Sequence, residues 1–223
     1  MRQRCYLCVG MLKMSAATLR VWCGYIVAAV AVLNGVLPYL EYTDPMSINV
    51  MEPFILICSQ RWNVSLLLIG YFIIFCNAPF IHAGTEMTLL RSSRRRWADG
   101  MVLYMAAHTV IYYGFILAFS MVVAAPRGYF GNMWSRSMYM LSNFPPLEYL
   151  SYGAVGLDES FMANWPVYEA AFHSFALLAL YSFFLAMLMF VGNLAMRRFI
   201  GSLAAILVHL VGYLMISDNM LFQ

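Results

Sequence analysis

The residues that could do chemistry in this chain are few, and most are cysteines and histidines in apolar surroundings. Cys5 and Cys8 form a C-x2-C pair, but a structural zinc site needs four ligands, and no second pair or nearby histidine completes this one. The sequence contains no H-E-x-x-H, G-x-S-x-G or phosphate-loop motif. We therefore predict no catalytic residue and no metal site, and we expect that the chain does not itself hydrolyse ATP.

Two histidines lie deep within apolar runs. His108 follows Asp99 by nine residues and His209 follows Arg198 by eleven. At the helical rise, each lies about 14 to 16 Å beyond the charged end of its run. Three interpretations stay open: a haem b held between the two imidazoles, hydrogen bonds between helices, or a path for substrate or protons. We predict no cofactor, and haem b at His108 and His209 is the lesser alternative.

Four further polar residues lie within or at the ends of apolar runs. Glu169 and His173 are four residues apart, so a helix places them on one face as an acid–imidazole pair. A structural contact between them is favoured over a proton relay. Asn77 and Asn193 complete the set of intramembrane polar candidates.

Composition indicates what must position these residues. Hydrophobic residues make up 63% of the 223-residue chain and charged residues only 10%, with a mean hydropathy of +0.75. A soluble domain carries about 25% charged residues, and a soluble monomer would not tolerate this much exposed apolar surface. The net charge of +3 is too small for a polyanion-binding protein, so no nucleic-acid partner is expected. These values predict an integral membrane protein in contact with the lipid bilayer.

Five apolar runs approach the roughly 20 residues that a helix needs to cross the hydrocarbon. They are residues 21–40, 62–81, 101–125, 174–194 and 199–216. They are too continuous for barrel strands, which alternate apolar and polar residues. The expected fold is therefore all-α, a polytopic transmembrane helical bundle forming one domain over 1–223. Because the sequence stops at Gln223, soon after the fifth run, a sixth span beyond it is also an open expectation.

The charges predict the orientation of the bundle. Ten of the 13 basic residues lie in the first tail, in the loop after the second run and in the turn after the fourth. Eight of the ten acidic residues lie in the alternate segments. Because basic loops stay on the cytoplasmic side, the N-terminus is predicted to be cytoplasmic.

Three segments are predicted not to span. Residues 1–20 mix apolar and basic residues as in a cytoplasmic amphipathic segment. Residues 47–58 are too short to cross and predict a re-entrant or interfacial helix on the outer side, with Pro53 in its first turn. Residues 126–166 are dense in aromatic side chains, which indicates an outer interfacial region of short helices.

The inner loop, residues 82–100, is the most informative stretch. Residues 85–91 can form a short helix with Glu86 near its N-terminal end and Arg91 at its C-terminal end, which matches the helix dipole. An Arg94-Arg95-Arg96-Trp97 anchor follows. This pattern serves at least as a topology signal, and it also predicts a docking loop for a cytosolic partner. The docking candidates are Glu86, Arg91, Arg94, Arg95 and Arg96.

The same stretch carries a family resemblance. The Asn-Ala-Pro-Phe turn at 77–80, followed by the Arg-Ser-Ser-Arg-Arg-Arg-Trp run at 91–97, resembles small ABC-2-type exporter permease subunits of Gram-positive bacteria. Those subunits typically show Pro-Phe and then an R-x-x-R-R-x-W stretch, and they usually have six spans. The general plan of the whole chain also agrees.

The resemblance implies a transport subunit without enzymatic activity of its own. It would pair with a separate cytosolic ABC ATPase and with a second membrane subunit, identical or different. It would lie in the bacterial plasma membrane as a multi-pass protein and export an amphipathic, peptide or lipid-like substrate. Two alternatives stay open: a haem b membrane anchor of a redox complex, and a non-transporting scaffold or immunity protein.

Overall fold

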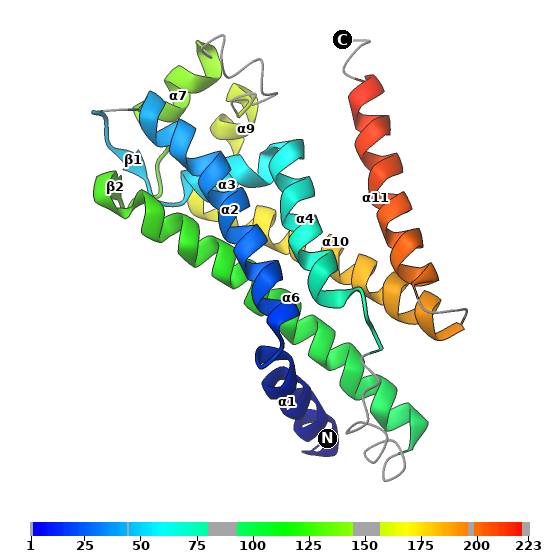
Figure 1. Ribbon diagram of the computed structural model, residues 1–223. Coiled ribbons are helices and arrows are strands. Elements are labelled where there is room, and N and C mark those ends of the chain that lie inside the picture. Colours follow the sequence, from blue (N-terminus) through cyan, green and yellow to red (C-terminus); the bar gives the residue numbers. More distant parts are fainter. Residues whose placement is uncertain (1, 44, 80–92, 145–156, 196–198, 220–223) are drawn as a thin grey trace. The chain divides into compact units, whose positions relative to one another are not determined.

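The computed structural model describes residues 2–43, 45–79, 93–144, 157–195 and 199–219 (Figure 1). Most of these residues are helical, which confirms the predicted all-α class. The helices are α1 (Arg2–Ala16), α2 (Leu19–Tyr42), α3 (Glu52–Ser59), α4 (Arg61–Phe75), α6 (Arg94–Ala124), α7 (Arg136–Asn143), α9 (Glu159–Asn164), α10 (Val167–Ala195) and α11 (Ile200–Asn219). A 3-10 turn, Ala125–Arg127, follows α6.

A short parallel pairing adds a feature that the sequence did not predict. Strand β1 (Ile48–Asn49) pairs with β2 (Gly128–Tyr129), with Ile48 opposite Gly128 and Asn49 opposite Tyr129. It links the segment before α3 to the segment after α6. A side chain at Gly128 would collide with Val50, because its Cβ would lie 2.4 Å from a Val50 methyl carbon.

Within the residues that the structure describes, three helices are long and apolar enough to cross a membrane. They are Leu19–Tyr42, Val167–Ala195, and α6 together with the 3-10 turn that continues it, Arg94–Arg127. A fourth is reached if α3 and α4, which meet at an angle of 89°, count together as one broken span. The apolar part of α11, Ile200–Met215, is shorter than a full span. The structure thus supports a membrane protein, while the five-span count stays a prediction.

The helix boundaries differ from the predicted runs for local reasons. α6 begins seven residues before 101 and α10 begins seven residues before 174. α4 ends at Phe75 rather than at 81, and a turn follows it at 76–79. Pro79 has no N–H to donate and disfavours a helical residue before it, which explains an early end. The Ala78–Pro79 peptide bond is cis.

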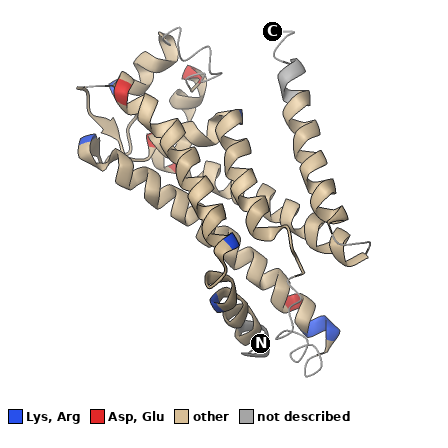
Figure 2. Ribbon diagram, viewed as in Figure 1, with Lys and Arg blue, Asp and Glu red and all other residues tan. Residues whose placement is uncertain are grey.

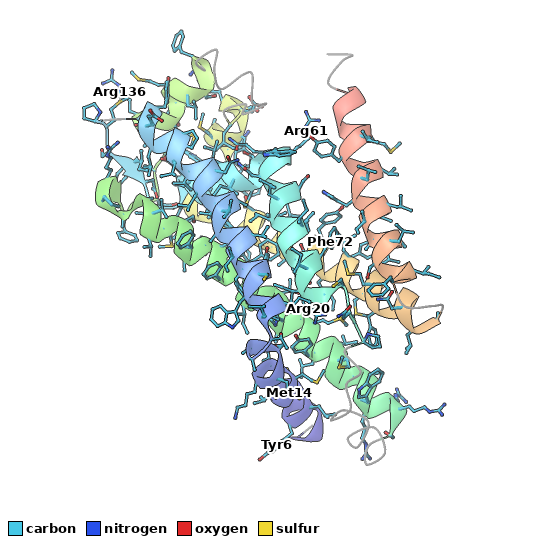
Figure 3. The ribbon with its side chains drawn as sticks, in the orientation of Figure 1. Tyr6, Met14, Arg20, Arg61, Phe72 and Arg136 are labelled. Carbon is cyan, nitrogen blue, oxygen red and sulfur yellow. The ribbon has the colours of Figure 1, made fainter. Side chains whose placement is uncertain are left out.

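The long helices keep their charges near their ends. In Figure 2, α2, α4, α6 and α10 are uncharged over most of their length. Arg20 lies in the first turn of α2 and Arg61 begins α4 (Figure 3). This distribution fits helices whose central turns lie in hydrocarbon.

The chain divides into two compact units. The first contains residues 1–24, 71–111 and 181–223, and the second contains residues 25–70 and 112–180. In the described residues of each unit, a network of buried polar groups joins segments far apart in the sequence.

Candidate functional site

The first unit contains a polar network centred on Asn193, near the end of α10. The Asn193 Nδ2 donates a hydrogen bond of 2.8 Å to the Ala78 carbonyl, and Asn193 Oδ1 accepts one of 2.9 Å from the Gly201 N–H. The Ser202 hydroxyl donates to the Cys76 carbonyl at 3.0 Å. We call these five residues the Asn193 cluster. It joins the turn after α4 to the end of α10 and the start of α11.

The cluster forms because α10 and α11 approach each other at two glycines. A Cβ on Gly192 would lie 2.5 Å from the Gly201 Cα. A Cβ on Gly201 would lie 2.4 Å from the Met189 carbonyl oxygen and 2.6 Å from the Asn193 N. These distances are too short for any side chain, so glycine is what allows the Asn193 amide to reach the backbone of α11.

A glycine pair on α11 gives a direct test of this packing. Gly201→Ala should destabilise the protein by about 2 to 3 kcal/mol, because the new methyl group must displace backbone atoms rather than a flexible side chain. Gly212→Ala is the matched control on the same helix, since a Cβ there meets nothing within 4 Å. It should be neutral or mildly stabilising. Thermal unfolding in detergent measures both variants, and equal midpoints would contradict the close contact.

The start of α6 presents the arginines predicted to dock a partner. Arg94, Arg95 and Arg96 are exposed and form the first turn of the helix. They were predicted within the loop 82–100, whereas the structure places them on the helix itself. Ser93 precedes them, and its carbonyl accepts a hydrogen bond from the Trp97 N–H. Three cations at a helix N-terminus oppose the helix dipole, so the dipole does not favour their position at the start of α6.

Packing holds this end of α6 in place. Trp97 is 9% exposed, and its ring lies 6.0 Å from the ring of Phe190 on α10. A Cβ on Gly100 would lie 3.0 Å from the Leu7 Cβ on α1. The exposed arginines therefore project from a helix start that is fixed on two sides. Glu86 and Arg91, the other docking candidates, lie outside the described residues.

The structure places His108 and His209 in separate aromatic surroundings. His108 is 3% exposed and lies edge-on to Phe75 at 5.5 Å and to Tyr104 at 5.6 Å. His209 Nδ1 lies 3.2 Å from the Tyr181 hydroxyl. The His209 ring also lies 6.4 Å from that of Phe72, which is labelled in Figure 3. The Tyr181 contact is a hydrogen bond between helices, one of the roles predicted for these histidines.

The remaining intramembrane candidates lie at helix ends. Glu169 and His173 are exposed in the first turns of α10, and the His173 ring lies edge-on to Trp165 at 4.7 Å. Asn77 is exposed in the turn after α4. Of the predicted polar residues, Asn193 is the one that the structure places at the centre of a network.

The second unit contains a buried carboxylate that the sequence did not single out. Glu52, at the start of α3, is 0% exposed. It accepts hydrogen bonds from the Tyr39 hydroxyl (2.9 Å), the Asn49 N–H (3.0 Å), the Ser135 N–H (2.5 Å) and the Ser135 hydroxyl (2.7 Å). Burial raises the pKa of Glu52 above its ordinary value, and the hydrogen bonds act in the opposite direction. We call these four residues the Glu52 cluster.

The Glu52 cluster closes the second unit around α3. It joins α2, the β1 segment and the start of α7, which are far apart in the sequence. The Asn49 amide adds hydrogen bonds to the carbonyls of Gly131 (2.6 Å) and Met133 (3.1 Å). α3 itself is buried from Glu52 to Ile57. Of the segment 47–58, only the part from Glu52 onward is helical, with Pro53 in the first turn, and residues Glu52 to Ile57 are packed inside the protein rather than lying on its surface.

Comparison with known proteins finds no match for this chain. No protein-family model, curated protein or solved structure matches this chain.

Proposed function

We propose that this chain is the transmembrane permease subunit of an ABC-2-type exporter. It would work with a separate cytosolic ATPase to move an amphipathic, peptide or lipid-like substrate outward. It would lie in the bacterial plasma membrane as a multi-pass protein with a cytoplasmic N-terminus and five spans, or six if a further one follows. Three helices of spanning length support its membrane location.

The observation that carries this proposal is the Asn193 cluster. The chain leaves α4 through Cys76–Ala78, shortly before the predicted docking loop begins at residue 82, and α6 begins at Arg94 within that loop. The carbonyls of Cys76 and Ala78 are bonded to Ser202 and Asn193. A displacement of the loop would therefore be transmitted directly to α10 and α11.

The exposed arginines supply the second part of the proposal. They belong to the predicted loop 82–100 and stand at a helix end fixed by Trp97 and Gly100. In this arrangement the loop residues Glu86 and Arg91 would contact the ATPase. Arg94 to Arg96 would attract acidic groups of the ATPase or anionic lipid headgroups.

Charge reversal tests the docking assignment. Replacing Arg94, Arg95 and Arg96 together by glutamate should reduce the recovered ATPase about tenfold, since steering charges would become repulsive. The readout is affinity capture of the tagged full chain from native membranes, with ATP turnover and mass spectrometry of the eluate. Reversal of Glu86 and Arg91 should have the same effect.

The matched control is Arg136→Glu, which changes an exposed arginine at the start of α7. Arg136 is predicted on the opposite side of the membrane, so ATPase recovery should not change. Full ATPase recovery by the triple variant would show that these arginines do not dock it.

A further inference from the structure

The Glu52 carboxylate meets two different kinds of donor. Its Oε1 accepts a hydrogen bond from the Ser135 N–H, and its Oε2 accepts one from the Asn49 N–H. These backbone groups can only donate. Oε2 also lies 2.9 Å from the Tyr39 hydroxyl and 2.7 Å from the Ser135 hydroxyl. A hydroxyl can turn and accept instead, so two of the four contacts are reversible, and both are made by the same oxygen.

A proton therefore fits on Oε2 inside the closed cluster. When Oε2 takes up a proton from water, its new O–H donates to one of the two hydroxyl oxygens, and that hydroxyl turns its own hydrogen away. The other contacts keep their positions, because both oxygens of the neutral acid can still accept. The Glu52 cluster thus accommodates the ionised and the neutral form of the same side chain.

No cation balances the charge of Glu52 within the described part of the chain. Glu52 is fully buried and forms no ion pair there. The ionisable groups that act on it are two phenols, Tyr39 on α2 and Tyr129 on β2. Phenols are uncharged near neutral pH. Ionised Glu52 is therefore a buried anion that is stabilised by hydrogen bonds alone.

The other charged groups of the adjoining elements are engaged elsewhere or exposed. Arg127, just before β2, donates a hydrogen bond of 2.9 Å to the Leu40 carbonyl. Arg136, labelled in Figure 3, is exposed at the start of α7, and Glu41 is exposed near the end of α2. None of the three forms an ion pair with Glu52.

Burial without a cation favours the protonated form of Glu52. Burying an unpaired anion costs far more than burying a neutral acid. The pKa of Glu52 is accordingly raised above its ordinary value of 4.5, chiefly by desolvation and against the effect of its hydrogen bonds. The closed cluster therefore binds a proton more tightly than a carboxylate that is open to water. By linkage, the stability that this proton adds is fully present below the ordinary value and is lost as the pH rises through the raised pKa.

We propose that Glu52 is a proton-binding site through which acidity on the outer side of the membrane holds the second unit closed. The segment that contains Glu52 is predicted on that side, so the proton comes from the outside medium. Because the cluster joins α2, the β1 segment and the start of α7, loss of the proton weakens the contacts of all three segments at once. This inference goes beyond the proposed function and holds whether or not the chain docks an ATPase.

Infrared difference spectroscopy of the full-length protein in nanodiscs tests the proton site. Titration of the native protein should show the carbonyl band of a buried carboxylic acid with a midpoint above pH 4.5, the ordinary value. Glu52→Gln should lack this band. Glu159→Gln, which alters an exposed acidic residue on α9, is the matched control and should keep it. A native midpoint at or below the ordinary value, or the same band in Glu52→Gln, would overturn the proposal.

Tyr39→Phe gives a second test that keeps Glu52 and remains informative if Glu52→Gln fails to fold. The variant removes one reversible hydroxyl and thus one donor to the carboxylate. The infrared midpoint should therefore move upward by roughly one pH unit. An unchanged or lower midpoint would contradict the assignment of the proton to this cluster.

Thermal unfolding tests whether the proton closes the unit. As the pH falls from neutral toward 4.5, the midpoint of the native protein should rise by roughly 2 to 5 °C relative to that of Glu52→Gln. Protease cleavage near Gly131 and Met133 should slow over the same range. His173→Gln removes an exposed imidazole of the same unit and should keep the full rise. If native protein and Glu52→Gln showed the same pH dependence, the proton would not hold the unit closed.

Discussion

Asn193→Leu is expected to destabilise the protein by about 3 kcal/mol. The substitution leaves the Ala78 carbonyl and the Gly201 N–H without their partner, and each buried unpaired group costs about 1 to 3 kcal/mol. For a chain of this size, the thermal midpoint should fall by roughly 6 to 12 °C. The measurement is unfolding of the purified protein in detergent, followed by tryptophan fluorescence.

Two further variants make this result specific. Asn193→Asp keeps an acceptor for Gly201 but loses the Nδ2 donor, so its midpoint should fall between those of the native protein and Asn193→Leu. Asn77→Ala removes an exposed asparagine from the adjoining turn and should change little. If Asn77→Ala and Asn193→Leu had equal effects, the Asn193 cluster would not be the feature that joins the turn to α10 and α11.

Glu52→Leu is expected to destabilise the second unit by roughly 4 kcal/mol. The change leaves two backbone N–H groups and two hydroxyls facing an apolar side chain in a buried site. Glu52→Gln should cost less, because its amide oxygen replaces part of the acceptor set while its NH2 group opposes a donor. The readout is the thermal midpoint together with protease accessibility of the segment that contains Gly131 and Met133.

The control for Glu52 is Glu159→Gln, which alters an exposed acidic residue in the first turn of α9. It should leave the midpoint within the error of the native protein. A Glu52→Leu protein as stable and as protease-resistant as the native chain would contradict the view that this carboxylate closes the second unit.

The sequence predicted the helical class well because apolar runs are a direct signal. Three of the predicted runs, 21–40, 101–125 and 174–194, lie within helices of spanning length. The predicted helix starts were less accurate. Arg94 to Arg96 have the composition of a loop, and yet they form the first turn of α6. An apolar run indicates which residues of a helix contact the hydrocarbon of the membrane, whereas the helix itself can extend beyond that run.

The partners of Asn193 and Glu52 in the two polar networks could not be predicted from the sequence. Asn193 was predicted as an intramembrane polar residue, but its partners are backbone groups of Ala78 and Gly201, which have no signature in the sequence. Glu52 was counted as one acid among eight on the outer side, and its main partner Ser135 is 83 residues away. One signal in the sequence was available. Glu52 stands directly before Pro53 and an apolar run, and a residue that begins a buried helix is buried with it.

The close approach of α10 and α11 could not be predicted from the sequence either. The sequence predicted a turn after the fourth run, at Arg197 and Arg198, and Gly192 and Gly201 lie on either side of that pair in the sequence. It did not predict that both glycines lie in contact, because the rotation of each helix about its axis decides that. A lone asparagine in an apolar run, such as Asn34, carries similarly little information until the structure shows that it is exposed.

The central claim is that this chain couples a cytosolic ATPase to movement of its membrane helices. The most direct measurement is ATP turnover of the complex captured by the tagged full chain and reconstituted in nanodiscs, compared with the ATPase alone. We expect the native chain to change turnover severalfold, and Asn193→Asp to bind the ATPase while losing most of that change. The claim would be contradicted if no ATPase co-purified with the native chain and if the chain did not change the ATP turnover of the ATPase.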